Sequence, residues 1–158
     1  MTRRNVLLSK EFFPSLLELE VKRSLRYQNF LSLLLMEATP GPSRDNGNEQ
    51  PSFTDRMVSL VRTQVRDTDL IGTARENTIT VVLLHTDRHG AANVANRLNS
   101  LVVSYLGPEE SSQRYLNFGM ACVPTHATDS ESLVSVAFGM LEKSKAQTRS
   151  RAELEVSR

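Results

Sequence analysis

One continuous apolar segment, residues 30–36 with the sequence FLSLLLM, constrains the fold of this chain more than any other feature. It has the length of a strand, and only Ser32 interrupts its apolar side chains. A strand with one face in water alternates apolar and polar residues, whereas a strand covered on both faces is apolar throughout. The segment therefore predicts a central strand of a sheet that is covered on both faces.

The rest of the chain alternates between helical and extended patterns. Helical spacing predicts helices over residues 10–27, 52–65 and 90–103, and from residue 129 or 130 to about 145, with a fraying tail. Pro14 fits only the first turn of a helix, so the first regular helix is expected to begin near it. Further strands are predicted at residues 69–71, 78–84 and 115–123, with a loop at 40–51 and a hairpin turn at 74–77.

This order of elements argues for an α/β fold of the α+β sandwich type, in which helices pack on a sheet. A chain of 158 residues is long enough for one domain with a real hydrophobic core, and short for two. We therefore expect residues 1–158 to form a single domain.

Composition excludes several classes of protein. The formal net charge of +1 gives no overall attraction to nucleic acid or to a membrane surface. No apolar run reaches the roughly 18 residues of a membrane helix, and no signal-peptide core follows the N-terminus, so we expect no membrane insertion of this segment and a cytoplasmic location. The one cysteine, Cys122, excludes an internal disulfide framework and fits a reducing compartment. His85 and His89 have metal-binding spacing but are expected at the end of a strand and the start of a helix, so we expect no metal site.

Several phrases in a fixed order carry a family resemblance. They are an opening helix with Glu20, Arg23 and Arg26 before the strand at 31–36; LLHTD at 83–87 followed by Gly90-Ala91 and VANRL at 94–98; NFGMA at 117–121; and the closing spacing of Ala137, Leu141, Lys145 and Arg149. Together, from about residue 9 to residue 151, they resemble the GGDEF domain of diguanylate cyclases. The resemblance implies a central, antiparallel-type sheet of about five strands flanked by helices, akin to nucleotide cyclases and polymerase palms. It also implies a bacterial source. Active members of the family bind GTP, and two subunits make cyclic di-GMP with the help of a divalent metal.

The catalytic signature of the family is altered in this chain. In the alignment that the resemblance implies, Gly-Gly-Asp/Glu-Glu-Phe falls on Arg75, Glu76, Asn77, Thr78 and Ile79. Glycines let phosphate approach the turn because they lack Cβ, and the acids ligate a hard dication, so these substitutions predict an inactive domain with no bound metal.

Outside the signature, fewer of the family's catalytic groups remain. The Asp-x-Asp of the first strand falls on Glu37-Ala38-Thr39, which keeps one carboxylate. Lys145 and Arg149 occupy positions that touch phosphates in the family. Their other interpretation is a solvated cationic face, which is the commoner situation for such residues.

A second family motif, Arg-x-x-Asp placed five residues before the signature, falls on Arg66 and Asp69. In the family it binds the product, cyclic di-GMP, and the positions of two further arginines that assist match Arg97 and Arg23. Arginine presents a planar fork to phosphate or to the O6/N7 edge of guanine, and a carboxylate accepts from the guanine N–H donors. The alternative is an unused relic, or a surface ion pair worth little free energy.

The resemblance thus implies a catalytically inactive GGDEF-like signalling domain that acts as a cyclic di-GMP receptor, with a change of domain association as its output. The alternative is a ligand-independent module that forms a homodimer or docks another signalling domain. A residual cyclase or GTP sensor is a third hypothesis, which the altered signature disfavours. No nucleic-acid partner is expected, because no basic-aromatic pattern follows Arg3 and Arg4.

Overall fold

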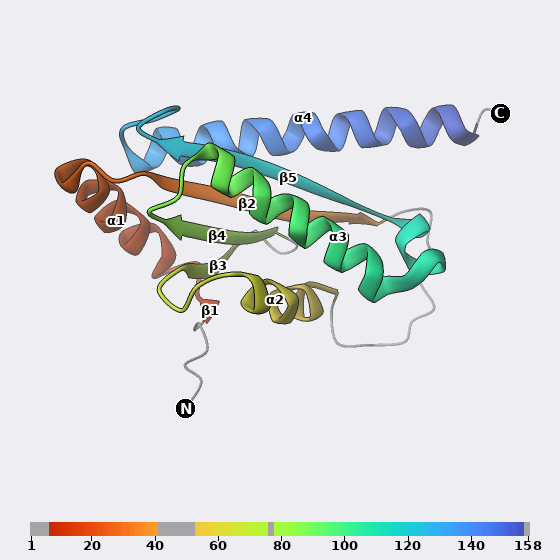
Figure 1. Cartoon of the computed structure of the whole chain (residues 1–158). Helices are drawn as coiled ribbons and strands as arrows, with labels where there is room; N and C mark the ends of the chain where they lie inside the picture. Colours follow the sequence, from red (N-terminus) through yellow and green to blue (C-terminus); the bar gives the residue numbers. More distant parts are fainter. Residues whose placement is uncertain (1–6, 41–52, 76–77, 157–158) are drawn as a thin grey trace.

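The computed structural model describes residues 7–40, 53–75 and 78–156 of the chain (Figure 1). In chain order the elements are β1 (Leu7–Leu8), α1 (Phe13–Tyr27), β2 (Leu31–Pro40), α2 (Phe53–Gln64), β3 (Leu70–Arg75), β4 (Thr78–Leu84), α3 (Arg88–Gln113), β5 (Arg114–Val123) and α4 (Ser130–Val156). The α/β prediction is confirmed, and within these ranges no helix is long and apolar enough to cross a membrane.

The five strands form one mixed sheet in the order β1-β3-β4-β2-β5. β1 runs parallel to β3, and every other neighbouring pair is antiparallel. β2 lies between β4 and β5, and residues 31–36 are all buried, which confirms the central strand covered on both faces. β4 spans the predicted residues 78–84, and β3 joins it in the predicted hairpin, whose residues 76–77 lie outside the described part.

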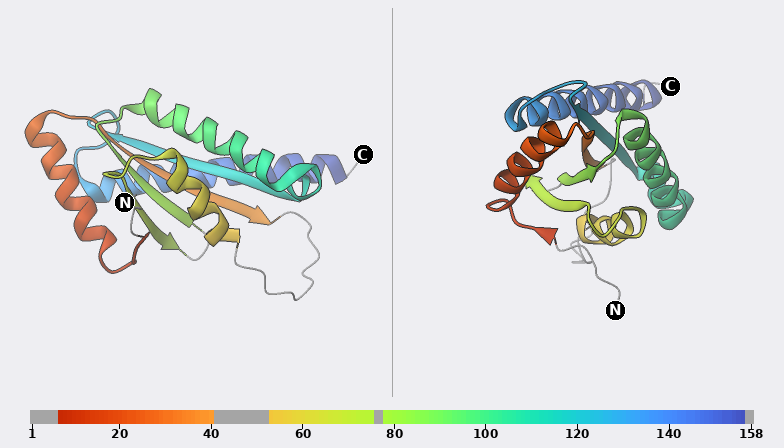
Figure 2. Two further views of the ribbon diagram at one scale, coloured as in Figure 1. Left: turned by 60° about the horizontal axis from the view of Figure 1, so that its bottom comes forward. Right: turned by 60° about the vertical axis from the view of Figure 1, so that its left-hand side comes forward.

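Helices α1 and α4 cover one face of the sheet, and α2 and α3 cover the other (Figure 2). Successive side chains of a strand point to opposite faces, so β2 supplies both cores. Leu33 and Leu35 pack with α1 and α4, whereas Leu34 and Met36 pack with α2 and α3. This is why residues 31–36 of the strand are apolar at every position but Ser32.

Side-chain hydrogen bonds explain the start of α4 and support its continuation past residue 145. Asp129 caps its start, as predicted: the Ser132 backbone N–H donates to Oδ1 at 2.8 Å, and the Ser132 hydroxyl donates to Oδ2 at 2.9 Å. These two bonds hold the pKa of Asp129 below its ordinary value, and the bond from the backbone N–H has the larger effect. The expected end near residue 145 is wrong, because the helix continues to Val156. Residues 146–155 are mostly good helix formers, and Thr148 donates to Asn117 Oδ1 of β5 at 2.7 Å.

Other predictions also differ from the structure. β3 spans Leu70–Arg75, beyond the strand predicted at 69–71 and into the turn predicted at 74–77, because it pairs with β4 along its length. α3 continues to Gln113 instead of ending near residue 103, although Gly107 and Pro108 are poor helix formers. β1 was not predicted, because two residues are too few for a sequence pattern. The predicted capping residue of α2, Ser52, lies outside the described residues.

A candidate ligand-binding cavity

Three of the four predicted ligand residues line one open cavity, where β4 leads into α3. The cavity has a volume of about 650 Å³, and Arg66, Asp69 and Arg97 all border it. Arg66 and Asp69 lie on the turn between α2 and β3, whereas Arg97 lies on α3. The antiparallel pairing of β3 with β4 brings that turn next to the end of β4, so residues far apart in sequence share this cavity.

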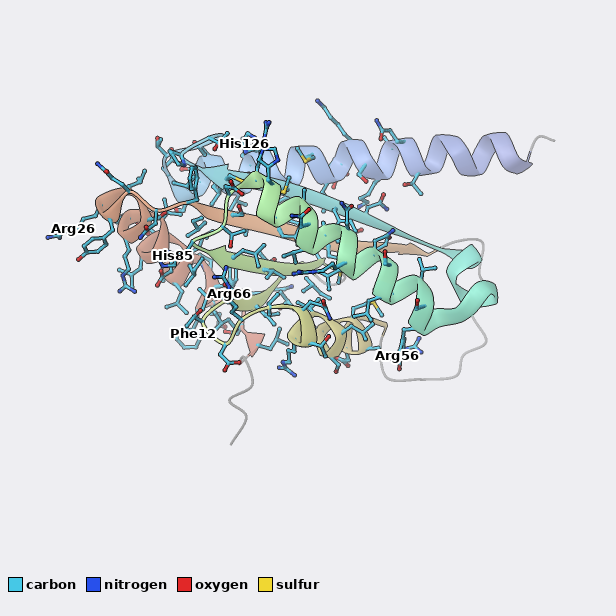
Figure 3. The ribbon with its side chains drawn as sticks, in the orientation of Figure 1. Phe12, Arg26, Arg56, Arg66, His85 and His126 are labelled. Carbon is cyan, nitrogen blue, oxygen red and sulfur yellow. The ribbon has the colours of Figure 1, made fainter. Side chains whose placement is uncertain are left out.

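The side chain of Arg66 is anchored at one nitrogen and open to solvent over most of its surface. Its Nη2 donates to the carbonyl oxygen of Leu84 at 2.8 Å and to the Thr86 hydroxyl at 2.7 Å. The side chain is 60% exposed, so a ligand in the cavity can reach the guanidinium. Figure 3 shows Arg66 beside His85 at this end of the sheet. The two anchoring bonds fix the direction of the fork before any ligand binds.

Asp69 is a structural residue as well as a cavity residue. Its Oδ2 accepts from the backbone N–H of Arg66 at 2.9 Å, and its Oδ1 accepts from the backbone N–H of Leu84 at 3.0 Å. The side chain is only 2% exposed, and Arg66 Nε lies 3.7 Å from Oδ2. The interpretation of Arg66 and Asp69 as a merely solvated surface pair is therefore wrong for Asp69, whose carboxylate joins two backbone segments.

The cavity also contains residues that sequence reasoning did not assign to it. Phe30, 47% exposed, offers an aromatic ring, and His85, which has a left-handed backbone with φ of 53°, offers an imidazole. Asp87 caps α3 by accepting from Gly90 N–H at 2.9 Å. A positive φ at a residue other than glycine is one signal that could have marked His85, but only a structure provides it.

The charges around the cavity are mixed. Two arginines, Arg66 and Arg97, lie with two acids, Asp69 and Asp87. A site built only for an anion would exclude carboxylates, because they repel it. This combination instead suits a ligand that carries both anionic groups and hydrogen-bond donors.

Arg23, the fourth predicted ligand residue, lies outside this cavity. It lies on α1 and pairs with Glu20, with Nη1 3.1 Å from Oε1. It borders a neighbouring hollow of about 160 Å³, which shares Phe30 and His85 with the larger cavity. The structure therefore places Arg23 next to the other three residues without bringing it into contact with the same space.

At the opposite end of β4, the predicted signature region holds an internal ion pair. Arg75 ends β3 and pairs with Thr78 in the hairpin, while Glu76 and Asn77 lie outside the described residues. Thr78 and Ile79 are buried, and the Thr78 hydroxyl donates to Glu37 Oε2 at 3.0 Å. Lys145 Nζ of α4 lies 2.8 Å from Glu37 Oε1.

This arrangement does not fit a divalent cation. The Glu37 carboxylate, 14% exposed, is already neutralised by Lys145, whose side chain is 22% exposed. The interpretation of Lys145 as part of a solvated face is therefore wrong. Within residues 7–40, 53–75 and 78–156, no three His, Cys, Asp or Glu residues gather where they could share a metal ion. A cation at Glu37 would have to displace the ammonium group, so no step of chemistry is derived through a metal here.

Cys122 of the edge strand β5 is buried beside Ser32 of β2 and does not border the cavity. Burial raises the pKa of its thiol, which a hydrogen bond with Ser32, 3.0 Å between oxygen and sulfur, partly offsets. A thiol with a raised pKa is a weak nucleophile near neutral pH, so the cysteine is interpreted as a small core residue.

Comparison with known proteins identifies a matching family and solved structures with a similar fold. A family described as "Diguanylate cyclase, GGDEF domain" matches residues 53–151. No curated protein matches the sequence at a significant level.

Solved structures resemble the chain over most of its length. The GGDEF domain of DgcB from Caulobacter crescentus, in complex with c-di-GMP, superposes with a TM-score of 0.76 at 12% identity, covering 94% of this chain and 92% of that one. The isolated GGDEF domain of TpbB (YfiN) from Pseudomonas aeruginosa gives a TM-score of 0.74 at 19% identity, with 89% and 86% covered. The active GGEEF domain of a diguanylate cyclase from Vibrio cholerae gives 0.73 at 16% identity, with 90% and 93% covered. At these identities the likeness shows the fold.

Proposed function

Because the chain belongs to the GGDEF family, as its match over residues 53–151 establishes, we propose that it is a catalytically inactive member that serves as a receptor for cyclic di-GMP. Residues 1–158 would form one degenerate GGDEF domain, with its core at about 9–151. Bound ligand would change the association of this domain with a second copy or with another signalling domain, because a ligand shifts only equilibria between states that it binds differently.

The observation that carries the proposal is the single cavity that Arg66, Asp69 and Arg97 share. Cyclic di-GMP offers two phosphates, which are anionic, and two guanines, whose edges carry both acceptors and donors. The two arginines match the phosphates and the guanine O6/N7 edges, and the acids match the guanine N–H donors. The GGDEF domain of DgcB, which has the same fold, was solved with this ligand.

Within this proposal Arg66 is the primary contact, since it is exposed and already oriented by Leu84 and Thr86. Asp69 keeps the turn in place through its bonds to backbone N–H groups and borders the proposed ligand space. Arg23 assists from the neighbouring hollow, or from a second copy of the domain that is bound to the same ligand.

Two observations support the absence of catalysis. The residues Arg75, Glu76, Asn77, Thr78 and Ile79 replace the glycines and acids of the signature. The ion pair of Lys145 with Glu37 occupies the carboxylate that would otherwise remain for a metal. We therefore propose that the domain needs no metal or other cofactor.

Calorimetric titration with cyclic di-GMP tests the proposal. The wild-type protein should bind stoichiometrically at micromolar or tighter affinity. Arg66→Ala should weaken binding at least tenfold, because charge-assisted bonds to phosphate contribute about 1.5–3 kcal/mol. Arg26→Ala is the matched control: Arg26 is exposed, lies against Tyr27 and borders none of the cavities described above, so its loss should leave binding unchanged.

If the titration of the wild type shows no heat of binding even at high cyclic di-GMP concentration, the receptor proposal is contradicted. The ligand-independent alternative would then stand, and it predicts that partner binding or dimerisation is the same in Arg66→Ala and Asp69→Ala as in the wild type. A loss of binding that is equal in Arg66→Ala and Arg26→Ala would also contradict the proposed site.

A further inference from the structure

A second cavity lies on the opposite side of the sheet from the arginines, between α1, α4 and the strands. Its volume is about 440 Å³. Its apolar wall includes Phe13 and Leu17 of α1, Leu33 and Leu35 of β2, and Val134 and Phe138 of α4. Mainly apolar cavities of this size with a few polar groups are typical binding sites for small molecules.

The floor of this cavity contains one buried hydroxyl without a partner. Thr80 of β4 borders the cavity, is 2% exposed, and its Oγ1 has no hydrogen-bond partner among the described residues. Its neighbours across the two adjoining strands are Leu35 and Gly72, and neither has a polar side chain. A buried hydroxyl that bonds to nothing destabilises a fold, so one found beside a cavity marks a point where a ligand atom gains by binding.

The charged side chains at the mouth of the cavity do not favour a charged ligand of either sign. Lys10, Glu18 and Glu131 border the cavity, and all three are exposed. Glu18 forms an ion pair with Lys22 at 3.0 Å. The other two charged residues at the mouth are one cation, Lys10, and one anion, Glu131. Neither sign of charge is favoured there, whereas the apolar wall favours an uncharged molecule.

We propose that this cavity binds an uncharged, largely apolar small molecule that carries one hydroxyl or carbonyl group, which hydrogen-bonds to Thr80. The inference is independent of cyclic di-GMP, because the two cavities share no lining residue. Phe13 is held on the strand surface at Gly72, where a Cβ would collide with its ring, so the wall of the site is part of the packed core.

The probe is N-phenyl-1-naphthylamine, which is uncharged and fluoresces strongly only in apolar surroundings. The chain contains no tryptophan that would contribute background emission. Wild-type protein should bind the probe saturably with one site per chain. Ser15→Trp, at an exposed position that borders the cavity, should block binding, whereas Ser135→Trp, exposed on α4 away from it, should not. Arg66→Ala should bind the probe as the wild type does.

A matched pair of competitors tests the role of Thr80. 2-Naphthol and naphthalene differ by one hydroxyl, and the wild type should prefer 2-naphthol by about three- to tenfold in displacing the probe, as one neutral hydrogen bond allows. Thr80→Val should abolish that preference without lowering Tm, because it removes a hydroxyl that has no partner in the free protein. Unsaturable binding, equal binding by Ser15→Trp, or an unchanged preference in Thr80→Val would overturn the proposal.

Discussion

Asp69 would connect the proposed ligand recognition with the stability of the fold. Its two carboxylate oxygens accept from the backbone N–H groups of Arg66 and Leu84, and only 3% of the residue is exposed. Exchange of the carboxylate for a shape-matched amide would turn an NH₂ donor toward one of those N–H groups. The residue therefore cannot be altered without disturbing the backbone that presents Arg66.

We expect Asp69→Asn to lower the free energy of unfolding by about 1–3 kcal/mol, because one buried N–H group loses its acceptor. Urea unfolding followed by circular dichroism measures this. Asp67→Asn, an exposed position two residues away, serves as the control and should be neutral. Equal stability of the two variants would show that the carboxylate has no such structural role.

Residue-scale features differ in how far the sequence could predict them. The family spacing identified Arg66, Asp69 and Arg97, and the structure places these three at one cavity. The ion pair of Lys145 with Glu37 could not be predicted, because it depends on which residue of α4 lies over the end of β2. The same holds for Phe30 and His85, whose place at the cavity follows from strand pairing and not from local pattern.

The contact between β5 and α4 depends on one glycine. A Cβ added at Gly119 would collide with the carbonyl oxygen of Ala137 and with Leu141. The strand and the helix therefore approach each other more closely here than any side chain would allow. Gly139, two residues after Ala137 on α4, has no atom near the position of such a Cβ, so it provides a matched comparison.

We expect Gly119→Ala to destabilise the protein by about 1–3 kcal/mol through overpacking, and Gly139→Ala to stabilise it by up to about 1 kcal/mol through helix propensity. Thermal unfolding of both variants beside the wild type measures the opposite shifts in Tm. A rise in Tm for Gly119→Ala would mean that α4 can move away from β5 without loss.

At the scale of elements, periodicity predicted which segments are helices and strands more reliably than where they end. β4 matched its predicted bounds because β-branched residues fill it and turn residues precede it. α3 and α4 both extend beyond prediction, and in the added part of α4 a contact distant in sequence is present, the bond of Thr148 to Asn117. A boundary set by a distant partner leaves no local signal.

The whole molecule has the architecture of an enzyme family with one end changed. The arginine cavity lies at the end of β4 where the chain passes into α3, and the altered signature lies at the start of the same strand. Ligand recognition and catalysis would therefore occupy different ends of one rigid strand, so the loss of one does not require the loss of the other. This separation would be the physical basis of the proposed receptor.

We expect the purified protein to make no cyclic di-GMP from GTP with Mg²⁺ or Mn²⁺, because neither the hairpin nor Glu37 offers the ligands that the metal requires. Restoring Gly-Gly-Asp-Glu-Phe at residues 75–79 should not by itself give activity, because the first strand keeps only Glu37 of the two acids that the family has there. Product analysis by chromatography, with the active GGEEF domain from Vibrio cholerae run in parallel, measures this. Turnover by the unmodified chain would contradict the proposed inactivity.

The position of β2 also determines the order in which the molecule can assemble. β2 comes early in the chain, but its antiparallel partner on one side is β5, and the pair of Leu31 with Val123 spans more than half of the sequence. Closing so long a loop is slow, because the chain between the two strands loses conformational entropy before the strand contacts that compensate for this loss have formed. On the ribosome, β2 therefore remains without this neighbour until β5 has been synthesised. During this interval the exposed edge of β2 is the point at which chaperones would be needed most.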